Sequence, residues 1–240
     1  MAPAVALRQH NTAGNDAAAP SRDEVLARYR QLREISRRLH HEILTRIPSD
    51  ALLQQARRLG LARGKTLILE DMDELNYAYD LAIHTASPRR SRAIDRYARS
   101  ARFAAGSGEA LLLEAMCTAR FSILIIERHH ETAGLIATDL LRQTEVWLVD
   151  IGLEISISEG DIIATRLYTP ERFSMTAGVF VPFTAELIED IAAEMPRHLG
   201  EISADALADN RHFAETVYRT ALASGIMDRM KYLDLAGNPR

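Results

Sequence analysis

The chain has 240 residues, of which 47% are hydrophobic and 26% are charged, and this balance excludes a wholly disordered protein. Its net charge of -4 at pH 7 excludes a uniformly basic nucleic-acid-binding protein. No apolar run approaches the roughly 20 residues that a membrane-spanning helix needs, so we expect no membrane partner.

The first 20 residues are rich in alanine and small polar side chains, and we expect them to form a flexible tail. Their longest apolar run, residues 5–7, is too short for the hydrophobic region of a secretory signal. The single cysteine, Cys117, cannot form an intramolecular disulfide, so nothing favours an oxidising compartment. We therefore expect a cytoplasmic protein.

A helical domain is predicted over residues 21–119. At its start, apolar residues recur every three or four positions from Val25 to Ile43, which is typical of one buried stripe on a long helix. The stripe consists of Val25, Tyr29, Leu32, Ile35, Leu39 and Ile43. Ser21 is the expected N-cap of this helix, and Pro48 ends it.

Further helices follow in the same domain. Ser49 or Asp50 is expected to cap a short helix that ends at Gly60, and residues 66–69 fit either a short strand or a connector. Residues 71–84 and 89–103 have helical patterns, separated by a break at residues 87–88. Ser107 is expected to cap one more helix.

Five short segments rich in β-branched, aromatic or other apolar residues come next, separated by turn residues. They are residues 121–127, 135–141, 145–151, 161–167 and 172–180. Five closely spaced strands predict a small antiparallel β-barrel of the SH3-like or OB-like type over residues 120–182. A C-terminal helical segment follows over residues 183–240, with caps at Thr184 and Ser203. The order of elements predicts an α+β fold without a doubly wound parallel sheet.

Several segments together resemble a known family. They are residues 33–42 (REISRRLHHE), 58–61 (RLGL), 138–142 (TDLLR), a strand with Glu145 and Val149, residues 156–167 (SISEGDIIATRL) and the region of Gly178. The chain resembles an uncharacterised bacterial protein family with an arginine-rich helical N-terminal region and a small β-barrel module. The resemblance spans residues 25–182 and implies this fold and a bacterial origin, without catalytic residues. Gly160 and Asp161 also have a structural explanation, because they suit a tight turn.

Two segments superficially resemble phosphate-handling motifs. Residues 60–66 end in Gly-Lys-Thr, but three residues separate the glycines where a P-loop has four, so we favour a helix end and a connector. Asp71 and Asp73 form an Asp-x-Asp sequence after an apolar run, similar to Mg²⁺-dependent phosphatases of the haloacid dehalogenase type. Those enzymes have Thr or Val where this chain has Leu75, and acidic residues also suit the start of a helix.

Histidine and cysteine give no clear metal or catalytic signal. Residues 40–42 and 129–131 are both His-His-Glu, but adjacent histidines on a helix diverge by about 100°, and the second triplet lies in a predicted hairpin loop. Cys117, among apolar residues, is predicted to pack in the core. We therefore predict no catalytic residue, no metal and no cofactor.

The distribution of charge is the most informative feature of the sequence. Residues 87–102 contain six arginines against one acid, Asp95. The six are Arg89, Arg90, Arg92, Arg96, Arg99 and Arg102. By contrast, residues 66–86 contain five acidic residues and neither Lys nor Arg. The five are Glu70, Asp71, Asp73, Glu74 and Asp80.

Two arrangements fit this distribution. In the first, which we favour, the acidic helix lies antiparallel against the basic helix, so that their charges compensate inside the fold. In the second, the guanidinium groups project outward and hold phosphates. Tyr97 and Phe103 would then be near enough to stack on bases, although Tyr97 and Ile94 suit core positions better.

Our hypothesis from the sequence is a non-enzymatic binding or adaptor protein whose six-arginine segment docks on nucleic acid or on an acidic protein surface. One alternative is a Mg²⁺-dependent phosphohydrolase centred on Asp71 and Asp73. Another is a structural subunit of a larger assembly, with an oligomer contact through the helix from Val25 to Ile43.

Overall fold

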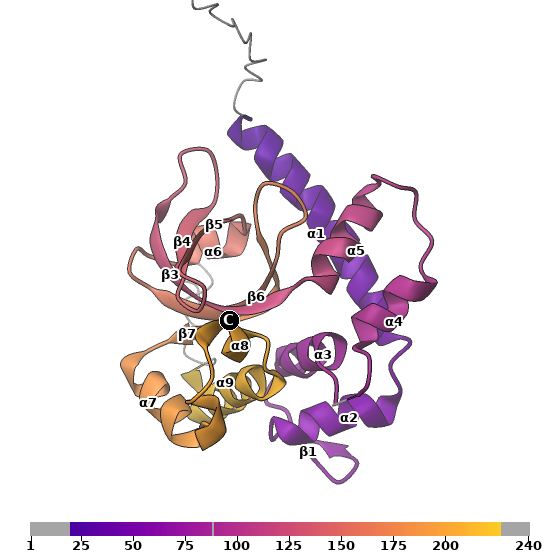
Figure 1. The fold of residues 1–240 in the computed structure, drawn as a ribbon, viewed down its shortest axis with the longest axis vertical. Coiled ribbons are helices and arrows are strands. Elements are labelled where there is room, and N and C mark those ends of the chain that lie inside the picture. Colours follow the sequence, from indigo (N-terminus) through magenta and orange to yellow (C-terminus); the bar gives the residue numbers. More distant parts are fainter. Residues whose placement is uncertain (1–19, 88, 227–240) are drawn as a thin grey trace, which may run out of the picture.

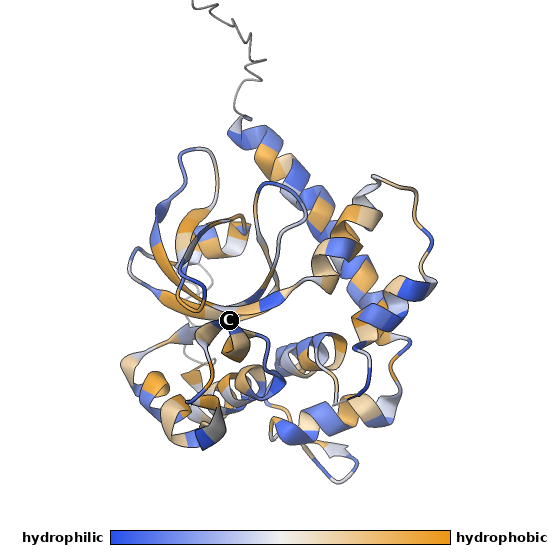
Figure 2. Ribbon diagram, viewed as in Figure 1, coloured by the Kyte–Doolittle hydropathy of each residue, from blue (hydrophilic) through white to orange (hydrophobic). Residues whose placement is uncertain are grey.

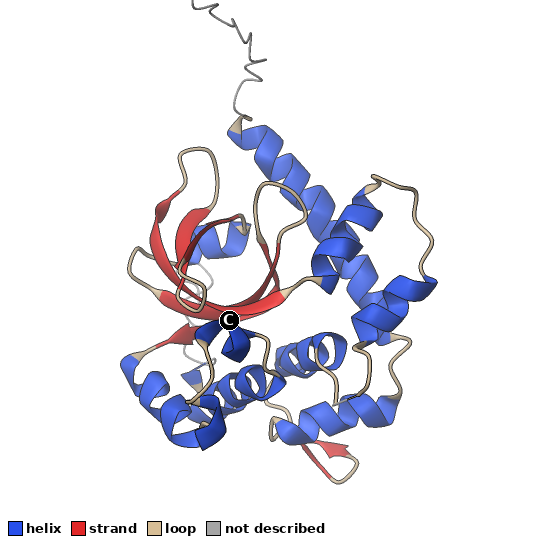
Figure 3. Cartoon of the chain, viewed as in Figure 1, coloured by secondary structure: helices blue, strands red, loops and turns tan. Residues whose placement is uncertain are grey.

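The computed structural model describes residues 20–87 and 89–226. Within these residues, helices precede and follow a five-stranded antiparallel sheet (Figure 3). The predicted α+β order of elements is therefore confirmed. The predicted tail lies outside the described residues, apart from Pro20. No helix in the described part of the chain has an apolar stretch of membrane-spanning length.

The first helix, α1 (Arg22–Leu44), begins at the predicted N-cap. The Ser21 hydroxyl accepts a hydrogen bond from the Glu24 amide, and the Glu24 carboxylate accepts one from the Ser21 amide at 2.8 Å. Hydrophobic and hydrophilic positions alternate along this helix (Figure 2). All six residues of the predicted stripe are buried in a core shared with α4 (Ala93–Ser100) and α5 (Gly108–Cys117). The stripe is covered by its own chain, and the oligomer contact expected through this helix stays a prediction.

The remaining N-terminal elements follow the predicted order with some corrections. They are α2 (Ser49–Arg58), the hairpin of β1 (Ala62–Arg63) and β2 (Thr66–Leu67), the 3-10 turn η1 (Met72–Glu74) and α3 (Leu75–His84). Gly60 ends α2 with φ 82°, as expected, but neither Ser49 nor Asp50 caps it, because Pro48 occupies the cap position. The predicted helix over residues 89–103 is reduced to α4, because Arg89 has φ 66° and Arg92 is extended.

All five predicted strands are present, but the predicted closed barrel is wrong. The strands are β3 (Arg120–His129), β4 (Leu135–Asp139), β5 (Thr144–Leu148), β6 (Ile162–Tyr168) and β7 (Met175–Phe183). Their order in the sheet is β5-β4-β3-β6-β7. The edge strands meet only at one isolated parallel bridge between Leu148 and Ser174. A closed barrel would need β5 to pair along β7. Instead β5 ends at Leu148 and the chain continues into a helix, so the sheet stays open.

That helix, α6 (Ile151–Ser156), was not predicted and lies in the concave side of the curved sheet (Figure 1). The carboxylate of Asp150 caps it by accepting hydrogen bonds from the amides of Gly152 and Leu153. Leu153 and Ile157 pack against inward-facing residues of the strands, such as Leu124. The helix therefore fills the space that a closed barrel would have enclosed.

The other face of the sheet packs against helices from both ends of the chain. Phe121 and Val181 contact a core built by α3 and by the C-terminal helices α7 (Ala185–Glu194) and α9 (Arg211–Ser224). Thr184 caps α7 as predicted. Ser203 caps only a short helix, α8 (Ala204–Ala208), and Asn210 then caps α9. Side chains on β6 alternate between the two faces, so Arg166 points toward α3 and α9 while Leu167 points to the concave side.

Candidate functional site

The six-arginine segment lies on the loop before α4, on α4 itself and just after it. The helix buries Ala93, Ile94 and Tyr97 against the core, which leaves Arg96 and Arg99 on its outer side. Five of the six arginine side chains belong to exposed residues, and Arg92 alone is half-buried. The exposed five are Arg89, Arg90, Arg96, Arg99 and Arg102.

Among the described residues, Arg92 is the one member of the segment that pairs with an acid. Its Nε and Nη2 atoms donate to the two carboxylate oxygens of Asp95 at 2.8 and 2.6 Å, and Nη2 also donates to the Cys117 carbonyl at 2.7 Å. These hydrogen bonds hold the pKa of Asp95 below its ordinary value. Both carboxylate oxygens of Asp95, the acid within the segment, therefore accept hydrogen bonds from Arg92.

No acid of residues 66–86 pairs with the other five arginines among the described residues. Arg96 and Arg102 donate only to nearby backbone carbonyls, and Asp80 pairs instead with Arg166 on β6. The predicted internal compensation between the acidic and basic helices is therefore wrong. Five guanidinium groups remain in contact with solvent.

The aromatic residues near the segment have different roles. Tyr97 is a core residue, as the sequence favoured: its ring is buried under the Arg46 guanidinium at 4.6 Å, and its hydroxyl donates to Glu42. Phe103, which follows the helix, is 36% exposed. Phe103 is thus the aromatic side chain of this segment that solvent reaches.

A cavity with a volume of about 670 Å³ lies beside the segment. It opens between the end of α3, the start of α4, the junction of α5 with β3, strand β6 and the start of α9. Four arginines and one acid line it: Arg92, Arg120, Arg166, Arg211 and Asp209. Hydrogen-bond donors therefore outnumber carboxylates on its wall.

Arg166 lies on the sheet side of this cavity in a buried ion pair with Asp80. Its Nε and Nη2 atoms donate to the two carboxylate oxygens at 2.8 and 2.9 Å, and the Tyr218 hydroxyl donates to the same carboxylate at 3.1 Å. The two charged side chains are only 6% and 3% exposed. Burial opposes the charge on Arg166, but the attraction of Asp80 outweighs it and holds the pKa of the guanidinium above its ordinary value.

His84, at the end of α3, also lines the cavity and is 4% exposed. Neither of its ring nitrogens has a hydrogen-bond partner among the described residues. Burial, followed by the charges of Arg166 and His40, holds the pKa of His84 well below its ordinary value. The ring is therefore neutral near pH 7, with one N–H donor and one acceptor nitrogen.

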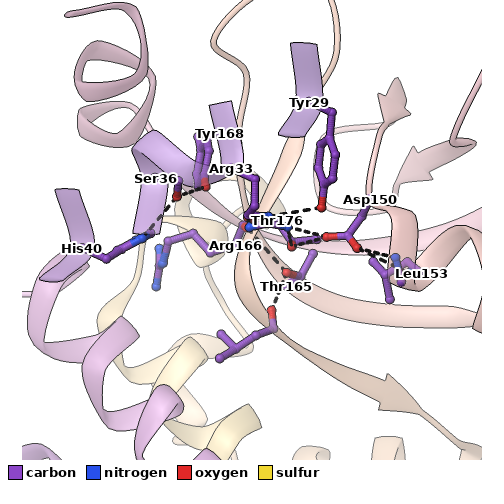
Figure 4. Close-up of polar contacts among 12 residues, drawn as sticks. Tyr29, Arg33, Ser36, His40, Asp150, Leu153, Thr165, Arg166, Tyr168 and Thr176 are labelled. Carbon is purple, nitrogen blue, oxygen red and sulfur yellow. Dashed lines mark hydrogen bonds and ion pairs between the residues drawn. The ribbon is translucent and has the colours of Figure 1, made fainter. Parts of the chain in front are cut away.

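A second polar cluster joins α1 to the sheet beside Arg166 (Figure 4). Arg33 donates to the Asp150 carboxylate at 2.5 Å, to the Thr176 carbonyl at 2.8 Å and to the Tyr29 hydroxyl at 3.1 Å. Asp150 in turn caps α6, so both charges are satisfied within the protein. A cavity of about 660 Å³ lies next to this cluster, but its buried charged groups already serve to join three elements.

Ser36 and His40 extend the same cluster along α1 (Figure 4). The Ser36 hydroxyl lies 2.5 Å from the Tyr168 hydroxyl and 3.2 Å from Nδ1 of His40. Burial lowers the pKa of His40 to about 4, although Asp80 partly offsets this. The side chain of His40 is thus held neutral between α1 and α3, with its ring edge-on to that of His84 at 6.2 Å.

The other motifs of the sequence have structural roles. Asp71 accepts a hydrogen bond from the Asp73 amide at 2.9 Å and caps η1, which is the helix-start interpretation of these acids. Residues 60–66 form the helix end and the small hairpin rather than a loop leading into a helix. No three His, Cys, Asp or Glu side chains gather as a metal site anywhere in residues 20–87 or 89–226.

Cys117 is half-buried and packs against the core of α1, α4 and α5, as predicted. Burial raises the pKa of its thiol, which keeps it protonated near neutral pH. The predicted turn role of Gly160 and Asp161 is also confirmed. Gly160 has φ 89°, and the Asp161 carboxylate accepts a hydrogen bond from the Ser158 amide at 2.8 Å.

Sequence reasoning missed the residues that build the large cavity, above all His84, Arg166 and Arg211. A signal for one of them was present: Arg166 interrupts an apolar strand, and a charge in such a strand must find a partner when it is buried. Asp80 and His84 are likewise one helical turn apart in a helix that is otherwise mostly apolar. No local pattern, however, indicated that α3, β6 and α9 would meet.

The fold and the site define an α+β protein with an open five-stranded sheet packed between helices, an exposed arginine segment and an arginine-lined cavity. Residues 23–230 match the model of DUF7986, a family of unknown function, and the chain belongs to this family. The resemblance to an uncharacterised family is thereby confirmed, while the expected bacterial origin stays a prediction. No curated protein and no solved structure matches the chain.

Proposed function

We propose that this protein is a non-enzymatic, cytoplasmic nucleic-acid-binding protein that contacts phosphates through the six-arginine segment. The observation that carries the proposal is that five of the six arginines are exposed and have no carboxylate partner among the described residues. They are Arg89, Arg90, Arg96, Arg99 and Arg102. Arginine forks bind phosphate oxygens bidentately, and such contacts supply most of the affinity of proteins for nucleic acid.

Nucleic acid fits this surface better than an acidic protein does. The cores of protein interfaces are enriched in aromatic and apolar side chains, but this segment turns Ile94 and Tyr97 inward. Phosphate contacts need only the guanidinium groups, and one exposed ring, Phe103, is available to stack on an unpaired base. Because stacking requires an unpaired base, we expect single-stranded nucleic acid to be preferred.

The test compares a segment variant with a charge-matched control. The variant carries Arg89→Gln, Arg96→Gln and Arg99→Gln, and the control carries Arg63→Gln, Arg128→Gln and Arg172→Gln, which are also exposed positions but lie outside the segment. Binding is measured at low salt by fluorescence anisotropy with labelled mixed-sequence single-stranded RNA and DNA. We expect the segment variant to bind at least about tenfold more weakly than wild type, and the control to bind within about threefold of it.

The outcome separates a local site from a general charge effect. If both variants lose the same affinity, binding follows net charge and the segment is not the site. If wild-type protein binds neither nucleic acid but binds polyglutamate, the partner is an acidic polypeptide and the proposal is wrong.

A further inference from the structure

We propose that the cavity between α3, β6 and α9 is a second site, which binds a small phosphorylated compound. The cavity shares half-buried Arg92 with the six-arginine segment but none of its five exposed arginines, and the inference goes beyond the proposed nucleic-acid binding. Its volume of about 670 Å³ is within the range of pockets for small organic ligands. The donors on its wall come from α3, β3, β6 and α9.

Arg166 places a buried guanidinium, paired with Asp80, in the wall of the cavity. Asp80 occupies its Nε and Nη2 atoms, and Nη1 has no hydrogen bond to any described residue. The buried ion pair also prevents the guanidinium from turning away. A rigid donor with one unused N–H₂ group is a preorganised contact for an oxygen of a ligand.

His84 is an unpartnered polar side chain in the same wall. Only 4% of His84 is exposed, and neither ring nitrogen has a hydrogen-bond partner in the described part of the chain. Leaving a buried N–H without an acceptor is unfavourable, whereas a phosphate oxygen in the cavity would accept that hydrogen bond. Of all side chains on the wall, this one most directly indicates a ligand.

Arg211 contributes a further guanidinium from the start of α9. It donates to the ring of His212 at 3.2 Å and to the Ala86 carbonyl at 3.5 Å, and it has no carboxylate partner among the described residues. Arg120 lies nearer the rim, where its contact with Asp205 is long at 3.9 Å and largely exposed. Both groups can therefore turn toward a ligand without breaking a buried ion pair.

The arrangement of donors selects the kind of anion. A planar carboxylate satisfies one guanidinium fork, as Asp80 does for Arg166. The wall instead offers donors from α3, β3, β6 and α9, and the terminal oxygens of a phosphate monoester can accept hydrogen bonds from several directions at once. The half-apolar remainder of the wall, with Phe121 and Ala214, suits the organic part of the ligand.

The experiment is isothermal titration calorimetry of the full chain with inorganic phosphate and with phenyl phosphate, and with acetate and phenol as comparison ligands. The variants are Arg211→Gln and His84→Phe, and Arg219→Gln is the control because it lies farther along α9, outside this cavity. Saturable binding of both phosphate compounds, and of neither comparison ligand, is expected. We expect Arg211→Gln to weaken phenyl phosphate binding about tenfold or more, His84→Phe about three- to tenfold, and Arg219→Gln less than about twofold.

Because His84 is buried and its substitution also changes the packing of the core, NMR of wild-type protein supplies a second measurement. Phenyl phosphate is expected to shift the ring ¹⁵N resonances of His84, as the ring gains a hydrogen bond. The proposal is overturned if no phosphate compound saturates, if acetate or phenol binds as well, if Arg211→Gln binds like wild type, or if the His84 resonances do not move. The segment variant with Arg89, Arg96 and Arg99 changed to Gln should keep its phenyl phosphate affinity, which separates this test from that of the proposed function.

Discussion

Removing the Asp80 carboxylate is expected to have the largest effect on stability of any single ion-pair change in the described chain. Asp80 and Arg166 are 3% and 6% exposed, so solvent screens their interaction very little. In Asp80→Ala, the Arg166 guanidinium stays buried but loses both hydrogen bonds to the carboxylate. The Tyr218 hydroxyl loses its acceptor as well.

The expected cost follows from these losses. Breaking a buried ion pair by removing one partner costs about 3–5 kcal/mol, because the remaining charge has no compensation. For a chain of this size, each kcal/mol corresponds to about 2–4 °C in Tm, so Asp80→Ala should lower Tm by about 6–20 °C. The double variant Asp80→Leu/Arg166→Met buries no charge and should recover at least half of the lost free energy.

The assay is urea denaturation followed by circular dichroism, for wild type, the single variants Asp80→Ala and Arg166→Met, and the double variant. The result expected is a double variant more stable than Asp80→Ala. The reasoning is refuted if Asp80→Ala costs less than about 1 kcal/mol, or if the double variant is less stable than both single variants. Either result would mean that the pair is hydrated or that its charges are not coupled.

Three further predictions concern other parts of the molecule. Burial lowers the pKa of His40 to about 4, so the unfolded chain binds more protons than the folded chain between pH 4 and 6.5. Acidification from pH 7 to pH 5 should therefore lower the free energy of unfolding by about 2 kcal/mol through this residue. His40→Gln should remove that part of the pH dependence in urea denaturation, and an unchanged pH dependence would contradict it. Gly134→Ala should lower the free energy of unfolding by more than about 2 kcal/mol in the same assay. Gly134 has φ 80°, and a Cβ there would lie 2.3 Å from the Leu148 carbonyl oxygen. An unchanged free energy of unfolding would contradict this close approach. Ser21→Ala should cost about 1 kcal/mol by removing the capping box of α1, and a Tm equal to that of wild type would show that this end of the helix is frayed.

Local patterns predicted most of the elements because the local signals were strong. The apolar spacing from Val25 to Ile43 and the caps at Ser21, Ser107 and Thr184 act within one turn of a helix, and all are present. Segments rich in β-branched, aromatic or other apolar residues, separated by turn residues, likewise predict the five strands. Where a signal is ambiguous, the prediction is wrong: the apolar composition around Ile151 predicts a strand through residue 151, whereas Asp150 caps α6 there.

The closure of the sheet and the location of the cavity depend on contacts between distant residues. Whether β5 pairs with β7 depends on how far β5 extends before α6 begins, which no single segment encodes. Asp80 and Arg166 are 86 positions apart in the chain, and the acidic helix directs Asp80 toward β6 rather than toward α4. The sequence therefore indicated which arginines are clustered, but it did not reveal that their acidic neighbours have other partners.

The most direct test of the central claim is the salt dependence of nucleic-acid affinity. Anisotropy titrations of labelled single-stranded RNA, from low to physiological salt, give the slope of log K against log salt for wild type and for the variant with Arg89, Arg96 and Arg99 changed to Gln. If these three side chains each neutralise a phosphate, the variant should lose about 2 from the magnitude of the slope. Equal slopes for the two proteins would show that the exposed guanidinium groups do not contact the nucleic acid.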